Sequence, residues 1–231
     1  MSTIINPLLG TTKIITPTNE GLVGYWSFNE SGSIAKDYSG NNKHGFLIGA
    51  TTRVDGINGG ALRFSTSRVR ISNTTTLQLS RSFTFSCWFK STGTSGGVYP
   101  CVFSTGKNDG SGWLIGYFSN THRFGITRPS LSSILYQSDS CLDNIWYHGV
   151  VTVGSGVTAP VSIYINGKLS ISSSTNQGLA TNTQDQSIGA DLNGGAGFWL
   201  GLIDEVRIYN RVLSAGEIST LYKSGISKII I

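Results

Sequence analysis

Charged residues are scarce in this chain, where they make up 13% of the 231 residues, about half the share of an ordinary globular protein. The 17 Lys and Arg residues outnumber the 12 Asp and Glu residues, which gives a formal net charge of +5. These basic residues are scattered and form no block. Because nucleic acids are bound by clustered basic side chains, we expect no nucleic-acid partner.

Cysteines and long apolar runs are scarce as well. The three cysteines, Cys87, Cys101 and Cys141, have no CxxC spacing, which indicates neither a disulfide framework nor a zinc site; a bridge between Cys101 and Cys141 stays open. No stretch is long and apolar enough to span a membrane. The first 20 residues lack the basic region and the apolar segment of a signal peptide. We therefore expect a soluble protein that takes no standard signal-peptide route.

Glycine is abundant, with 30 residues, and polar turn residues separate many short apolar segments. The alternation from Ser82 to Lys90 predicts a central strand, and Asn166-Gly167 between two alternating runs predicts a type I′ hairpin. The segments ALRFS and RVRIS suggest a second hairpin, closed near residues 65–67. A capping box predicts one helix that begins after Ser214 and ends before Gly225.

These patterns predict an all-β fold, a two-sheet antiparallel sandwich with one short C-terminal helix. The β-branched, proline-punctuated residues 1–20 are interpreted as an extended arm, with a frayed tail as the alternative that stays open, and residues 21–231 as one domain.

One carboxylate interrupts an apolar pattern in the last strand segment, FWLGLIDEVRIYNR. If this segment is a regular strand, its even positions share one face, and that face is apolar except for Asp204. An unpaired buried carboxylate is costly. Asp204 must therefore be protonated, turned outward by a bulge, or neutralised by a cation or by hydrogen-bond donors. We expect an inward Asp204, while Glu205 points the other way and pairs with Arg207.

The acidic residues do not form the pair that a glycosidase needs. Two catalytic carboxylates must lie about 5 to 9.5 Å apart across the scissile bond, whereas the neighbouring Asp204 and Glu205 should point to opposite faces. No serine or cysteine nucleophile signature accompanies His122 or His148. We therefore expect that the protein is not an enzyme.

The ordered series of motifs resembles the laminin G-like, concanavalin A-like lectin and glucanase jelly-roll domains. The motifs are GLVGYWSFNE, DYSGNNKHG, GGALRF, SFTFSCWFK, WYHGVVTV, VSIYINGK, SIGAD and GLIDEVRIYNRVLSAGEIS, between Gly21 and Gly225. The resemblance implies two curved antiparallel sheets packed face to face. It also implies a binding, adhesion or spacer module that often holds a structural calcium ion.

A calcium site follows from the same resemblance. The loop and the late acid that meet around calcium in the family match Asp37, Asn42, His44 and Asp204. Calcium binds 6 to 8 oxygens, which suits an inward carboxylate and a loop rich in Asp, Asn and Gly. Lys43 departs from this pattern because it adds positive charge. Without a metal, Asp204 would accept backbone N–H groups or pair with Lys36 or Arg207.

A glycan-binding surface would present aromatic rings with amides and carboxylates nearby. The candidates in this sequence are Trp113, Tyr117, Trp199, Asn108, Asp109 and Asn120. Trp199 alternates with Leu200 and Leu202, so we expect it outside the main core. The alternative is that these aromatic rings pack beneath loops or against the arm.

Two functions remain open. The first is a non-catalytic binding or adhesion module that recognises a glycan or a protein surface and holds structural calcium. The second is a decoration or fibre component of a phage or other virion, in which residues 1–20 bind neighbouring subunits. Since no signal peptide is expected, we predict synthesis in the cytoplasm and a final place on a virion or another extracellular surface assembly.

Overall fold

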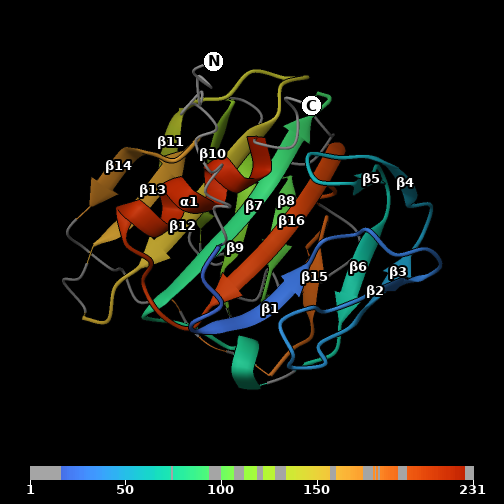
Figure 1. Ribbon diagram of the computed structural model, residues 1–231, viewed down its shortest axis with the longest axis horizontal. Coiled ribbons are helices and arrows are strands. Elements are labelled where there is room, and N and C mark those ends of the chain that lie inside the picture. Colours follow the sequence, from blue (N-terminus) through green and yellow to red (C-terminus); the bar gives the residue numbers. More distant parts are fainter. Residues whose placement is uncertain are drawn as a thin grey trace, which may run out of the picture.

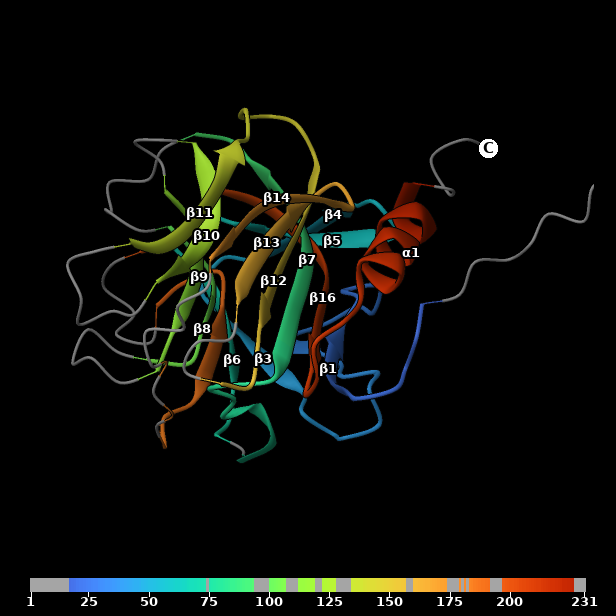
Figure 2. The same ribbon diagram turned by 90° about the vertical axis from the view of Figure 1, so that its left-hand side faces the viewer.

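Two antiparallel β-sheets of eight strands each pack face to face in the computed structural model (Figures 1 and 2). The structure describes residues 17–73, 75–93, 100–106, 112–118, 122–127, 134–156, 160–173, 179, 181, 183–191 and 197–226. Within these ranges one α-helix, α1 (Ala215–Ile226), lies on the outer side of one sheet. The predicted all-β sandwich with a C-terminal helix is therefore confirmed.

The sheet that carries α1, here called the helix-side sheet, is centred on two long strands. Its order is β14 (Lys168–Ser173), β13 (Val161–Ile165), β12 (Tyr147–Val153), β7 (Phe83–Ser91), β16 (Gly201–Tyr209), β5 (Gly60–Phe64) and β4 (Thr52–Asp55). The first strand, β1 (Leu22–Trp26), pairs with the second half of β16.

The second sheet, here called the opposite sheet, has its outer face turned away from α1 (Figure 2). Its order is β11 (Ile134–Ser140), β10 (Arg123–Thr127), β9 (Leu114–Phe118), β8 (Cys101–Ser104), β15 (Gln186–Ile188), β6 (Arg68–Ile71), β3 (Gly45–Ile48) and β2 (Ile34–Ala35). A short 3-10 helix, η1 (Thr75–Leu77), follows β6.

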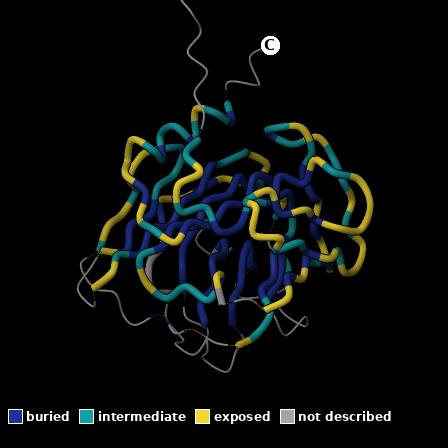
Figure 3. Tube along the Cα trace, turned by 60° about the horizontal axis from the view of Figure 1, so that its bottom comes forward, coloured by how far each residue is buried: buried dark blue, intermediate teal, exposed yellow. Residues whose placement is uncertain are grey.

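The main core lies between the two sheets. Strand β7 contributes Phe83, Phe85, Cys87 and Phe89 to it, as the alternation predicts, and each of these side chains is at most 1% exposed. Figure 3 shows the same division along the chain, with buried residues in the strands and exposed residues in the connecting loops. Cys87, Cys101 and Cys141 are buried and free, so Cys101 and Cys141 form no bridge.

The two predicted hairpins have different outcomes. Strands β13 and β14 pair around Asn166 and Gly167, whose φ angles of 51° and 75° are those that a type I′ turn needs. The segments ALRFS and RVRIS do not pair, because β5 belongs to the helix-side sheet and β6 to the opposite sheet. Alternation marks both strands but does not say which sheet each strand joins.

Helix α1 covers a small second core on the outer face of the helix-side sheet. This core consists of Val150, Tyr209, Leu213, Ile218 and Leu221. The predicted capping box is present: the Glu217 carboxylate accepts the Ser214 N–H, and the Ser214 hydroxyl accepts the Glu217 N–H. Gly225 lies inside the last turn of α1 and not after it, so the predicted end of the helix is wrong. It packs so closely on Trp88 that a Cβ there would lie 2.6 Å from the ring.

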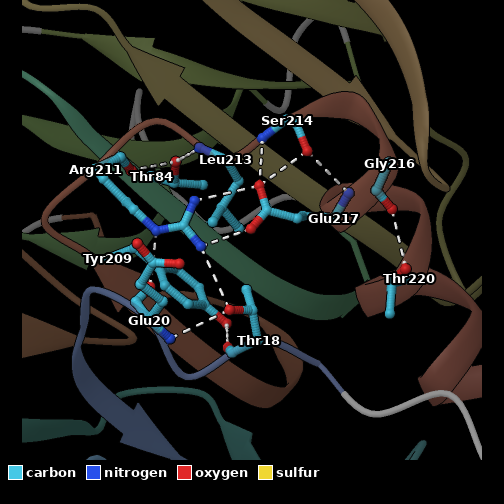
Figure 4. A network of polar contacts seen from close by, with 10 residues as sticks. All are labelled: Thr18, Glu20, Thr84, Tyr209, Arg211, Leu213, Ser214, Gly216, Glu217 and Thr220. Carbon is cyan, nitrogen blue, oxygen red and sulfur yellow. Dashed lines mark hydrogen bonds and ion pairs between the residues drawn. The ribbon is translucent and has the colours of Figure 1, made fainter.

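The chain enters the described structure beside the start of α1, where Arg211 holds it (Figure 4). The Arg211 guanidinium donates to the Glu20 carbonyl at 2.8 Å, to the Thr18 hydroxyl at 3.4 Å and to Glu217 Oε1 at 2.6 Å. The Tyr209 hydroxyl donates to the Thr18 carbonyl at 3.2 Å. We call these five residues the Arg211 clamp. Residues 1–16 of the predicted arm lie outside the described residues.

Candidate functional site

A bulge in β16 decides where the two candidate acids point. The pairing with β7 shifts between Asp204 and Arg207, and Glu205 has a φ of 53°. Ile203 and Val206 enter the main core, whereas Asp204 lies opposite Trp88 on the outer face. The predicted common face of the even positions is therefore wrong, because the extra residue of the bulge reverses the alternation.

The Asp204 carboxylate is fully buried and only half satisfied. Its Oδ2 accepts the N–H groups of Ile57 at 2.9 Å and Asn58 at 3.1 Å, while its Oδ1 has no hydrogen-bond partner among the described residues. Burial and then the Glu205 charge raise the pKa of Asp204 to about 7, against the lowering effect of the N–H donors. The sequence left three of these explanations for Asp204 as alternatives: a bulge, hydrogen-bond donors and protonation. In the structure all three contribute to the burial of this carboxylate.

Glu205 lies in a second buried polar cluster on the same side. Its carboxylate accepts the Tyr25 hydroxyl at 2.9 Å, the Asn58 side-chain amide at 3.2 Å and the Arg207 guanidinium at 2.5 Å. That guanidinium also stacks over the Tyr25 ring, 4.1 Å from its centroid. The expected pair with Arg207 is confirmed. The expected opposite direction of the two acids is wrong, since both bind Asn58.

Asp37 closes its own loop. Its Oδ1 accepts the N–H groups of Tyr25 and Ser39, and its Oδ2 accepts the Ser39 hydroxyl and the Lys43 N–H, all at 2.8 to 3.0 Å. His44 Nδ1 accepts the N–H of Asp37 itself at 3.0 Å. Each carboxylate oxygen therefore already receives two hydrogen bonds, and the negative charge is neutralised by protein donors.

This arrangement does not fit a calcium ion shared by Asp37 and Asp204. A bound cation would have to displace donors from Asp37, and the Lys43 carbonyl next to Asn42 already accepts the Trp26 indole N–H at 2.9 Å. Over the described ranges, no three His, Cys, Asp or Glu side chains lie close enough together to hold a metal ion. The calcium site at Asp37, Asn42, His44 and Asp204 stays a prediction. Among the described residues, Asp204 Oδ1 is a buried oxygen without a hydrogen-bond partner.

A buried serine and histidine pair lies beneath α1 and is not apparent from the sequence. Ser86 Oγ and His148 Nε2 are 2.9 Å apart, and the two residues are 0% and 1% exposed. The rings of Trp88 and Tyr222 pack against the imidazole, and burial lowers the pKa of His148 to about 3. The pair is closed to a substrate. Only the cross-strand register, which the sequence does not show, brings these two residues together.

The predicted ligand-binding aromatics are buried. Trp113, Tyr117 and Trp199 are 0%, 1% and 1% exposed and belong to the main core. The expectation that Trp199 lies outside the core is wrong: residues 198–200 precede β16, so strand alternation does not apply, and Trp199 packs edge-on against Phe89 and Tyr117. The remaining candidates, Asn108, Asp109 and Asn120, lie outside the described residues.

Exposed aromatic rings of the described chain occur elsewhere. Tyr38 is 44% exposed and Phe46 is 52% exposed. Tyr38 follows Asp37 and carries the Lys36 ammonium over its ring, 5.1 Å from the centroid. Phe46 stands on the outer face of the opposite sheet, where it faces Ile34 on β2 and Arg70 on β6. Both ring positions were missed by sequence reasoning.

A laminin G family model, described as the concanavalin A-like lectin/glucanases superfamily, matches residues 63–219. The chain belongs to this superfamily. No curated protein matches the sequence. The membership agrees with the resemblance carried by the motifs and with the two-sheet sandwich.

Several solved structures are similar to this domain. The binding domain of Paraclostridial Mosquitocidal Protein 1 has a TM-score of 0.70 and 20% identity, over 89% of this chain and 52% of that chain. Domain 4 of AbnA, an extracellular arabinanase from Geobacillus stearothermophilus, was solved with arabinotriose. It has a TM-score of 0.69 and 22% identity, over 87% of this chain and 98% of that chain. Trypanosoma rangeli sialidase has a TM-score of 0.66 and 18% identity, over 91% of this chain and 33% of that chain.

These similarities establish the fold. The chain spans about half of the mosquitocidal binding domain and a third of the sialidase, but nearly all of the arabinanase domain. In the described part of this chain, no helix is both long and apolar enough to cross a membrane.

Proposed function

We propose that this domain is a non-catalytic module that binds a glycan or a protein surface. The similarity to arabinanase domain 4 carries the proposal, because a single domain of the same extent was solved there with a bound saccharide. The similar domain of the mosquitocidal protein is also named a binding domain. Both of these similar domains are thus described by binding, which supports the same role for this chain.

Asp204, Glu205 and the pair of Ser86 and His148 support a role without catalysis. Asp204 and Glu205 are 0% and 4% exposed, and Glu205 is held in an ion pair with Arg207. A catalytic carboxylate or nucleophile must reach the substrate, and these groups lie beneath other side chains.

A glycan array tests the proposal. The full chain should bind at least one saccharide on an array of plant, bacterial and animal glycans, and it should release no reducing sugar from that ligand. An absence of binding to every glycan and to surface-receptor ectodomains would contradict the proposal. Saccharide hydrolysis that is lost in Asp204→Asn would contradict its non-catalytic part.

Calcium remains a prediction that a melting experiment can decide. If Asp204 Oδ1 binds calcium, chelation with EGTA should lower the melting temperature of the wild type but leave that of Asp204→Asn unchanged, because the variant has lost the charged oxygen ligand. An excess of Mg²⁺ should not restore the melting temperature, since this smaller ion prefers a tighter octahedral shell. Equal shifts of the melting temperature in both proteins, or no shift in either, would contradict the calcium prediction.

We also propose a second candidate, assembly into a larger surface particle through residues 1–20. The Arg211 clamp supports it, because these hydrogen bonds hold Thr18 and Glu20, the last part of this segment, against the domain. Deletion of residues 1–16 keeps the clamp and should abolish self-association in analytical ultracentrifugation without changing the melting temperature. An unchanged sedimentation profile would exclude an assembly role for the arm.

A further inference from the structure

We propose that the outer face of the opposite sheet binds a neutral saccharide, with one sugar ring over Phe46 and its hydroxyl groups on the pair of Arg70 and Asp185. This inference rests on the proposed binding function and names its site. We call the side chains concerned, Ile34, Phe46, Ile48, Arg70 and Asp185, the Phe46 face.

Strand register brings the apolar part of the Phe46 face together. Phe46 on β3 lies directly opposite Ile34 on β2 and opposite Arg70 on β6. Ile48, two residues along β3, lies on the same side. These side chains remain exposed on the outside of a sheet: Ile34 is 44%, Phe46 52% and Ile48 39% exposed. The result is a flat apolar platform with an aromatic ring at its centre.

A polar pair borders this platform. Arg70 Nε donates to Asp185 Oδ2 at 2.5 Å, and the Asn73 N–H donates to Asp185 Oδ1 at 2.8 Å. No other hydrogen bond of Arg70 to the described residues is present, so its two terminal NH₂ groups still offer donors. Each Asp185 oxygen also retains acceptor capacity. Burial raises the pKa of Asp185, but the Asn73 N–H and Arg70 outweigh it and hold the pKa below its ordinary value.

The combination fits a saccharide better than other ligands. A pyranose or furanose ring has an apolar C–H side, which an aromatic ring can cover, and a rim of hydroxyls that both donate and accept. Arg70 and Asp185 cancel each other's charge but keep spare donors and acceptors side by side, as two neighbouring hydroxyls require. An anionic group on the free N–H donors of Arg70 would lie beside the negatively charged Asp185 carboxylate, which repels it. We therefore assign the face to a neutral sugar.

The location of the Phe46 face also suits binding. It lies on the opposite sheet, whereas α1 and the Arg211 clamp lie on the far side of the helix-side sheet (Figures 2 and 4). A ligand on the Phe46 face therefore does not compete with whatever contacts the clamp.

Substitutions on the face test the proposal. The full chain and its variants are titrated on a glycan array that presents neutral oligosaccharides, including arabinotriose, beside carboxylated and sulfated glycans. Phe46→Ala and Arg70→Ala should each weaken binding of the neutral ligand about tenfold, and Phe46→Tyr should retain it. The matched controls are Leu169→Ala, which removes a 56% exposed side chain of β14, and Arg63→Ala, which removes an exposed arginine of β5. Both should bind as the wild type does.

Each other outcome overturns a distinct part. If the wild type binds no glycan, the saccharide site on the Phe46 face is wrong, and the proposed function then depends on binding to a protein surface alone. If it binds a neutral glycan and Phe46→Ala and Arg70→Ala bind equally well, the function stands and the Phe46 face is wrong. If only carboxylated or sulfated glycans bind, or only an acidic protein, the neutral ligand class is wrong. Equal melting temperatures of all variants exclude a loss of folding.

Discussion

Replacing Arg207 with Met should lower the free energy of unfolding by about 3 to 5 kcal/mol, the cost of leaving a buried charge without its partner. The side chains of Arg207 and Glu205 are 10% and 5% exposed and form a direct ion pair. Of the partners in the described part of the chain, removal of the guanidinium leaves the Glu205 carboxylate with the Tyr25 hydroxyl and the Asn58 amide. Urea denaturation followed by tryptophan fluorescence measures the change.

A double variant separates the charge effect from lost packing. If an unpaired Glu205 charge causes the loss, adding Glu205→Gln to Arg207→Met should recover a large part of the stability, and the two changes should be strongly non-additive. Additive losses, or a single-variant loss below about 1 kcal/mol, would show that the pair contributes little. The surface pair of Arg70 and Asp185, with side chains 52% and 26% exposed, is the matched control, and Arg70→Ala should cost well under 1 kcal/mol.

The pH dependence of stability should show two opposite contributions that largely cancel in the wild type. Asp204 has a pKa of about 7 in the folded protein against 3.8 in the unfolded chain, so its contribution falls as pH rises from about 4 to 7. His148 has a pKa of about 3 against 6.5, so its contribution falls as pH drops from 6.5 to 3. Each slope is about 1.4 kcal/mol per pH unit.

In single variants, the dependence of the free energy of unfolding on pH should show the contribution of Asp204 or of His148 alone. Asp204→Asn should become more stable as pH rises from about 4 to 6.5, because only the His148 contribution remains. His148→Gln should become less stable over the same range, because only the Asp204 contribution remains. The total change in each variant should be roughly 3 kcal/mol, measured by denaturation at half-unit pH steps with EGTA present. Parallel profiles of the wild type and both variants would contradict the assignment of these two pKa values.

The parts of the fold that were predicted from the sequence depend on local rules. The alternation of β7, the Asn166-Gly167 turn and the Ser214 capping box each follow from the conformational preferences of a few neighbouring residues. The sheet to which β5 and β6 belong depends on contacts far along the chain, and the same local pattern suits either sheet.

The candidate site was less predictable because its geometry depends on an unmarked bulge. The positive φ at Glu205 occurs without a glycine or asparagine, so no residue type signals that the alternation reverses there. The sequence did single out Asp204 as a misplaced acid, and the structure places it on the outer face with two backbone donors. The residues were therefore identified correctly, but their directions were not.

The Asp37 loop was visible in the sequence only in part. An aspartate that accepts the N–H of the residue two positions later is a common turn, and Ser39 fulfils this rule. The hydrogen bonds from Tyr25 and Lys43 join separate segments, so the sequence did not show that both carboxylate oxygens are saturated. The saturated Asp37 carboxylate therefore does not favour the calcium role that the resemblance implies for this loop, and the calcium site stays a prediction.

The Arg211 clamp has a mechanical consequence. It binds Thr18 and Glu217, nearly 200 positions apart in the chain, to one guanidinium group. Tension applied between the segment before Thr18 and the start of α1 would load these few bonds and the side chain of Arg211 first. The strand pairs of the sandwich would carry little of that force. Tension between the N-terminal segment and the start of α1 would therefore not open the core while the clamp holds.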